Sequence, residues 1–269
     1  MTPPPSAAQI SLWLALVRPG DGNRYRPLVS AAEAATGDRL RLPAARDRWL
    51  TARALLRHVA ARLDHPIGAQ VLRRCAACGR DDHGAPHLGD GIYTSIAKTD
   101  RCVIVAVGEG PAGVDIESAD CVIPCSSAVF AEAEQRLMTV LTPEERVARW
   151  TAKEAIGKLS GLGLRQASTT VVPYPTGACW VEASDARGEE CVVRTVDIGQ
   201  GQVATLAARC PADPQTRWVV LGSPTSPGWN KSFDEPGPTV VLSNRQGRSL
   251  APAAPALDPE ALSMEGARR

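Results

Sequence analysis

The chain has 269 residues and a mass of 28.4 kDa, enough for one large domain or two small ones with a buried core. Its formal net charge of +1 argues against a protein that grips nucleic acid through a basic surface. No apolar run approaches the roughly 18 residues of a membrane-spanning helix, and the start of the chain lacks the basic residues of a signal peptide. We therefore expect a cytoplasmic protein, a monomer, that uses neither nucleic acid nor membrane as a partner.

The first hundred residues predict strands and helices in alternation. The apolar run 10–17 predicts a strand, and residues 28–35 predict a short helix. Pro43 opens a longer helix that runs to about Asp64 and buries Trp49, Leu56, Val59 and Leu63. Further strands are predicted at 92–96 and 102–107. The long helix also carries four arginines, which on an amphipathic helix usually form a solvated face: Arg46, Arg48, Arg53 and Arg57.

The eight cysteines do not indicate a disulfide scaffold, because the chain is neither short nor cysteine-dense. Cys102, Cys179 and Cys191 lie in apolar runs and are typical of small core residues. One group has spacing typical of a metal site, namely Cys75, Cys78, His83 and His87. Structural zinc normally takes four such ligands. A very compact loop without zinc is the other interpretation.

An acidic strand is predicted at Gly113–Glu117. Because side chains alternate along a strand, Asp115 and Glu117 lie on one face and Val114 and Ile116 on the other. Two carboxylates on an otherwise apolar strand are costly to bury unless a positive charge lies between them. Mg²⁺ meets this need, because it binds a few carboxylates and keeps other positions for phosphate oxygens and water.

The strongest helix signal in the chain lies between Thr142 and Gly161. Thr142 and Glu145 form a capping-box pattern, and Pro143 occupies the first helical position. Within this helix, Glu154 and Lys158 are spaced four residues apart, with Lys153 beside them. A solvated Glu–Lys pair is the simple interpretation. Alternatively, Glu154 is the third carboxylate of the metal site, and Lys153 and Lys158 bind phosphate oxygens.

The remaining sequence predicts a helix at 132–141 and four short strands, at 169–172, 179–182, 191–196 and 203–208. From residue 222 onward Pro, Ser and Gly recur, which is typical of a disordered tail. We therefore divide the chain into two α/β (α+β) halves, 1–110 and 111–221, followed by the tail 222–269. A ligand site is expected between the halves.

Two motifs in this order resemble the signature of the Sfp-type 4′-phosphopantetheinyl transferases. The first is Gly113–Glu117, and the second joins Trp150, the run Lys153–Ala155 and Lys158 to Gly161-x-Gly163-Leu164. The resemblance covers roughly residues 10 to 210. It implies a fold of two similar halves related by a pseudo-twofold axis. It also implies transfer of phosphopantetheine from coenzyme A to a serine of an apo acyl- or peptidyl-carrier protein, with release of 3′,5′-ADP. Secondary-metabolite carriers are expected by analogy.

The resemblance also implies roles for particular residues. Asp115, Glu117 and Glu154 would bind Mg²⁺, and Lys153 and Lys158 the pyrophosphate of coenzyme A. Glu154 or a metal-bound water would take the serine proton. Arg48 would bind the nucleotide end of coenzyme A, and Arg53 is a second candidate for this contact. Lys158 and Glu154 are therefore the expected catalytic residues.

This chain departs from the family at Ala97-Lys98, where related enzymes carry Ser-His and the histidine contacts a phosphate of coenzyme A. An ammonium group can replace that contact as a point charge. Three alternatives follow: an active transferase, a weakened relative that only binds coenzyme A or a carrier, and an unrelated protein that matches by chance.

Overall fold

The computed structural model describes residues 10–17, 20–62, 71–75, 78–81, 84–88, 92–108, 110–165, 167–169, 171–172, 181–198, 201–209, 217–221 and 239–243. The elements up to residue 108 are β1 (Ile10–Leu16), α1 (Asp21–Tyr25), the 3₁₀ helix η1 (Arg26–Leu28), α2 (Ala31–Asp38), α3 (Pro43–Arg62), β2 (Leu72–Arg74), β3 (Ala85–His87), β4 (Tyr93–Lys98) and β5 (Cys102–Gly108). Those that follow are β6 (Ala112–Ser118), α4 (Glu132–Met138), α5 (Pro143–Ser160), η2 (Ala167–Thr169), β7 (Val181–Ser184), β8 (Glu190–Asp197), β9 (Gln202–Arg209), β10 (Arg217–Leu221) and β11 (Thr239–Ser243).

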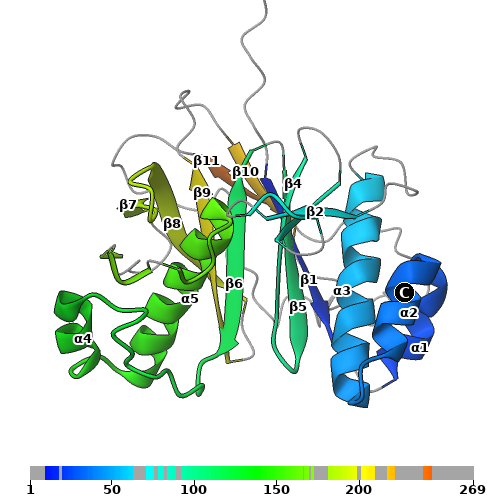
Figure 1. Cartoon of the computed structure of the whole chain (residues 1–269), viewed down its shortest axis with the longest axis horizontal. Coiled ribbons are helices and arrows are strands. Elements are labelled where there is room, and N and C mark those ends of the chain that lie inside the picture. Colours follow the sequence, from blue (N-terminus) through cyan, green and yellow to red (C-terminus); the bar gives the residue numbers. More distant parts are fainter. Residues whose placement is uncertain are drawn as a thin grey trace, which may run out of the picture.

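The strands form two sheets, with a long helix on the outer face of each (Figure 1). A seven-stranded sheet has the order β11-β10-β1-β5-β4-β3-β2, and a four-stranded sheet has the order β6-β9-β8-β7. In the larger sheet, β1 pairs antiparallel with β5 and parallel with β10. In the smaller sheet, the neighbouring strands pair antiparallel. Helix α3 packs on β5 and α5 packs on β6 and β9, so the layers run helix, sheet, sheet, helix.

Strand β5 shows why an unbroken apolar run is needed at the centre of this arrangement. Its seven residues are all buried. Cys102, Ile104 and Ala106 face the other sheet, where they meet Val114 of β6 and Leu206 of β9. The alternate side chains Val103, Val105 and Val107 pack instead against α3. Since both faces are covered, a polar residue at any of these positions would be buried without water.

Helix α5 begins and ends where the sequence predicts. The Thr142 side chain accepts a hydrogen bond from the Glu145 amide, Glu145 bonds back to the Thr142 amide, and Pro143 follows the cap. At the other end Gly161 has a φ of 71°, the left-handed conformation that glycine adopts at low cost.

The structure differs from the predictions at three places. Residues 167–169 form a 3₁₀ helix, and no strand is assigned to the described residues of the predicted strand 169–172. Strand β10, from the predicted second half, joins the sheet of the first half through β1. Strand β11 lies inside the predicted tail and pairs with β10, so this part of the tail is a sheet strand. The rest of the tail lies outside the described residues, and the pseudo-twofold relation stays a prediction.

Among the helices of the described residues, none combines the length and the apolar character needed to cross a membrane.

Candidate active site

The site begins where α5 lies directly on β6. A Cβ atom added to Gly113 would stand 1.9 Å from the Ala155 carbonyl oxygen, which leaves room for glycine only. Gly113, Asp115 and Glu117 share the face of β6 that is turned toward α5, because side chains alternate along a strand. Val114 and Ile116 point into the core between the sheets. The alternation predicted from the sequence is therefore confirmed, and it presents two carboxylates to the helix.

Lys158 of α5 binds the first of these carboxylates. Its Nζ lies 2.5 Å from Asp115 Oδ1 and donates to the Val114 carbonyl oxygen at 3.1 Å. The other oxygen, Asp115 Oδ2, is buried and has no hydrogen-bond partner. A buried carboxylate oxygen left without a donor is costly, so this atom is suited to receive a cation or a donor from a ligand.

The three predicted metal ligands influence one another electrostatically. Burial, opposed by Lys158, raises the pKa of Asp115. Burial and the charge of Asp115 raise the pKa of Glu117, whereas a hydrogen bond from Trp150 and the charge of Lys158 lower it. Burial and the charge of Asp115 also raise the pKa of Glu154. Each carboxylate would therefore gain from a positive charge placed between them.

The donor chemistry fits Mg²⁺, which prefers carboxylate oxygens, and the unpartnered Asp115 Oδ2 fits it as well. Nevertheless, within the described ranges no three His, Cys, Asp or Glu side chains form a group that could hold a metal ion in their present positions. Lys158 takes the place of a cation at Asp115 Oδ1. Metal binding would therefore require these side chains to rearrange.

A cavity of about 420 Å³ lies beside the carboxylates, between the two halves. One wall comes from α3, β4 and the β2–β3 hairpin, and the other from the end of α5 and the loop after it. Five cationic side chains line it, and none of its lining residues is acidic: Arg53, Arg73, Lys98, Lys158 and Arg165. Because Lys158 belongs both to this cavity and to the Asp115 pair, it joins the two parts of the site.

Lys158 pairs with Asp115, whereas two other cations of this cavity, Arg53 and Lys98, lie over an aromatic ring instead of a carboxylate. The Arg53 guanidinium lies 4.4 Å from the centre of the Trp49 ring, and its buried Nε has no hydrogen-bond partner. Burial and the charge of Arg73 lower the pKa of Arg53 to about 10. Lys98 Nζ lies 5.7 Å from the same ring centre, and burial, followed by the charges of Arg53 and Arg48, lowers its pKa. Such a concentration of cations favours a ligand with several negative charges.

The loop after α5 forms the second wall because two glycines allow it to fold back on the helix. The Gly163 amide donates to the Gly157 carbonyl at 2.9 Å. A Cβ atom on Gly157 would stand 2.3 Å from the Gly163 carbonyl oxygen. The Gly161-x-Gly163 pattern therefore brings Leu162 and Arg165 to the cavity.

Two predicted ligand residues lie elsewhere. Arg48 forms an ion pair with the exposed Asp100 and does not line the cavity, although its charge still acts on Lys98. Lys153 is 2% exposed, and its Nζ lies 2.6 Å from Glu134 Oε2 inside the protein. Its position does not support the predicted contact with phosphate. Conversely, sequence reasoning missed Arg73 and Arg165, because neither belongs to a motif.

The cysteine–histidine loop is a hairpin between β2 and β3. Arg74 pairs with Ala85 and Leu72 with His87, so His87 lies at the end of the hairpin away from Cys75. His87 is paired with Leu72, three residues before Cys75. At about 3.3 Å per residue, the backbone positions of Cys75 and His87 are therefore roughly 10 Å apart along the strand. Cys75 is buried and Cys78 exposed, and His83 lies outside the described residues. The register does not favour a zinc site that includes both Cys75 and His87.

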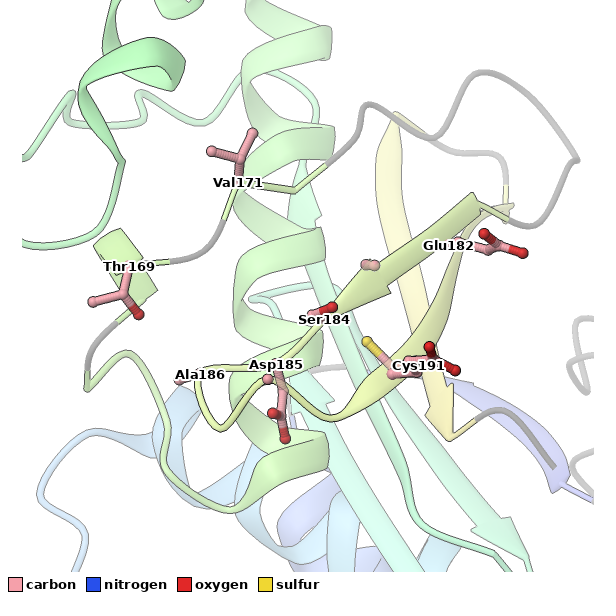
Figure 2. A pocket seen from close by; sticks show the side chains of 10 residues that line it. Thr169, Val171, Glu182, Ser184, Asp185, Ala186 and Cys191 are labelled. Atoms are coloured by element: carbon pink, nitrogen blue, oxygen red, sulfur yellow. The ribbon is translucent and has the colours of Figure 1, made fainter. Parts of the chain in front are cut away.

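A second cavity, of about 660 Å³, lies at the β7–β8 hairpin and shares no residue with the site above (Figure 2). Thr169 and Val171 face it from the segment after α5. Its buried acid, Asp185, is already bound by the Arg209 guanidinium at 2.5 Å and by two backbone amides. No lysine or arginine is among the residues that line this cavity, so it lacks the cations of the first one.

Comparison with known families finds one family model that covers both the acidic strand β6 and helix α5. Residues 111–200, about a third of the chain, match the family model of the 4′-phosphopantetheinyl transferase superfamily. This segment includes β6, α4, α5 and β8, and so contains the carboxylates and Lys158. A search of curated proteins found no match. The matched segment therefore supports phosphopantetheinyl transfer as the general class of activity.

Proposed function

We propose that this protein is an Sfp-type transferase that moves 4′-phosphopantetheine from coenzyme A to a serine of an apo acyl- or peptidyl-carrier protein. The observation that carries the proposal is the position of Lys158. It lines a cavity whose charged lining residues are all cationic, and it pairs with Asp115, the carboxylate whose charge raises the pKa of Glu117 and Glu154. Coenzyme A has a matching division, with negative phosphates at its nucleotide end and the reacting pyrophosphate next to them. The superfamily match over residues 111–200 supports the same class of reaction.

The residues of the cavity would bind the nucleotide end. Arg53, Arg73 and Lys98 would neutralise phosphate oxygens, and the stacked Trp49–Arg53 pair would offer a flat surface to the base. Lys158 and Arg165, on the other wall, would bind oxygens of the pyrophosphate. Because the transition state of phosphoryl transfer spreads charge over these oxygens, fixed cations beside them lower the barrier.

Asp115, Glu117 and Glu154 would hold Mg²⁺, which would supply charge neutralisation at the pyrophosphate. Glu154 has a second possible role, because burial and Asp115 raise its pKa and so make it a stronger base for the serine proton. A carboxylate bound to a metal is a weaker base. The serine proton therefore passes to Glu154 only if that residue is not held by the metal, and otherwise to water.

The test is to incubate the pure protein with coenzyme A, Mg²⁺ and a panel of apo-carrier proteins, and to weigh the carriers by mass spectrometry. The proposal expects a gain equal to one phosphopantetheine group on the carrier serine. A matched carrier with alanine at that serine should gain nothing. Binding of coenzyme A without any gain of mass would favour the second candidate, a weakened relative, for which the replacement of the family's histidine by Lys98 is the supporting observation.

A further inference from the structure

Glu134 of α4 is a buried carboxylate for which the proposed chemistry has no use. It is 0% exposed although it belongs to a helix near the surface. Its Oε1 accepts a hydrogen bond from the Val172 amide at 2.9 Å, and its Oε2 accepts one from the Ala131 amide at 3.0 Å. Burying a carboxylate is costly, so a buried glutamate at this position needs a structural or functional reason.

Two cations of α5 reach this carboxylate. Lys153 Nζ lies 2.6 Å from Glu134 Oε2, and Arg149 Nη1 lies 3.5 Å from Oε1. Each cation also holds the chain that follows the helix. Lys153 Nζ donates to the Ala167 carbonyl and Arg149 Nη1 to the Val172 carbonyl, both at 2.7 Å. One carboxylate and two cations thus connect α4, α5, η2 and Val172 inside the protein.

The same two turns of α5 carry the reactive residues. Glu154 follows Lys153 directly, and about 100° of helical rotation separates the two side chains. Trp150, in the same turn, donates a hydrogen bond to the Glu117 carboxylate. Its ring centre lies 6.3 Å from that of Phe130, which precedes α4. A shift or rotation of α5 at Lys153 would therefore move Glu154 and Lys158 relative to Asp115, which sits on a strand of the sheet.

We propose that the buried Glu134–Lys153 pair, supported by Arg149, is a strut that sets the position of α5 over β6. In this role Glu134 and Lys153 are positioning residues that touch neither coenzyme A nor carrier. The proposal rests on the proposed function for its catalytic consequence, but the strut itself is a property of the fold. It gives Lys153, the lysine next to Glu154, a role other than phosphate binding.

The experiment compares Glu134→Gln, Lys153→Met and the double variant with the wild type in the transfer assay. Glu134→Gln leaves two buried cations without their carboxylate, and Lys153→Met leaves Glu134 with Arg149 as its remaining cation. The double variant removes one charge of each sign and so restores the net charge of the cluster. We expect each single variant to lose kcat by about tenfold or more while KM for coenzyme A stays within about threefold, because the wall that carries Arg53, Arg73 and Lys98 does not belong to α5. The double variant should recover most of the lost kcat. Glu132→Gln is the matched control, since Glu132 lies on the same helix but pairs with Arg136 at the surface.

A phosphate-binding lysine gives a different pattern. Lys153→Met would then raise KM for coenzyme A, and Glu134→Gln added to it would recover nothing; this result overturns the strut. Should Glu134→Gln fail to fold, folding of the double variant is the expected rescue, and failure of both contradicts the proposal. A wild type without transfer activity refutes the proposed function alone. The strut is then decided by melting temperatures and by hydrogen exchange of α5, which should show non-additive effects of the two substitutions; additive effects overturn it.

Discussion

Glu154 is the residue on which the proposed chemistry depends most. Glu154→Gln keeps the size of the side chain but removes its charge, as does Asp115→Asn for Asp115. We expect either change to reduce turnover by at least about 10²-fold, the usual effect of losing a charge-stabilising group. Steady-state assays with a responsive apo-carrier provide the measurement. Turnover within threefold of the wild type would remove that residue from the site.

The same glutamate should destabilise the protein when no cation is present. Because burial and Asp115 raise its pKa, the folded protein keeps a proton on Glu154 at pH values where the unfolded chain, with a pKa of about 4.3, has lost it. The free energy of unfolding therefore falls as the pH rises from that value through the raised pKa.

Glu154→Gln removes this pH-dependent penalty. In EDTA, its melting temperature relative to the wild type should therefore increase between pH 4 and pH 7.5. Added Mg²⁺ should raise the melting temperature of the wild type more than that of the variant. If the difference in melting temperature between the variant and the wild type stays constant across this pH range, the charge of Glu154 does not destabilise the folded protein.

Lys98 tests the nucleotide end of the cavity. Lys98→Ala should raise KM for coenzyme A by about tenfold, near the value of one partly exposed charged hydrogen bond. Its effect on kcat should be much smaller, because ground state and transition state lose the contact alike. With dephospho-coenzyme A, which lacks the 3′-phosphate, the substitution should have almost no effect if that phosphate is the partner. Equal KM values for wild type and variant would exclude the contact, and Lys98→Arg is the matched control.

At the scale of elements, α5 is placed by glycines as much as by apolar contacts. Gly157 lies within the helix, where replacement by alanine normally stabilises a helix by about 1 kcal/mol. Here the added Cβ would stand 2.3 Å from the Gly163 carbonyl oxygen, and backbone cannot move aside as a flexible side chain can.

Gly157→Ala should therefore lower the melting temperature, against the expectation from helix propensity. It should also weaken coenzyme A binding, because the Gly161–Arg165 loop forms a wall of the cavity. Thermal melting and calorimetric titration with coenzyme A provide the two measurements. A stabilised variant with unchanged affinity would mean that the loop is not held against Gly157 in solution.

At the scale of the whole molecule, the last described strands belong to the sheet of the first half. β11 covers only the outer edge of β10, and β1 and β5 stand between β10 and the strand β4 that lines the cavity. Truncation after Leu221 should therefore leave kcat and KM close to their wild-type values and lower the melting temperature only slightly.

Truncation after Arg209 additionally removes β10 and exposes the edge of β1, so it should cost clearly more stability and favour aggregation. Melting curves and size-exclusion chromatography of the two truncated chains separate these effects. A loss of transfer activity on removal of residues 222–269 alone would show that the tail contributes to the site.

Much of the second half follows from the sequence because its signals are local. The capping box at Thr142, Pro143 and the left-handed Gly161 specify the ends of α5 within a few residues of the chain. The alternation along Gly113–Glu117 specifies which side chains leave β6 together. Strand β5 can also be predicted from the sequence, because burial on both faces requires an unbroken apolar run.

The tertiary structure alone decides which distant groups meet. Lys153 looks like a phosphate ligand beside Glu154, yet its partner is Glu134 on another helix. Arg73 and Arg165 carry no sequence signal, but the fold brings both to one cavity with Arg53 and Lys98. The parallel pairing of β10 with β1 places a strand from residues 217–221 in the same sheet as residues 10–16. Propensity and periodicity act over a few residues, whereas the pairing of buried charges and strand edges depends on contacts that exist only once the sheets and helices have packed.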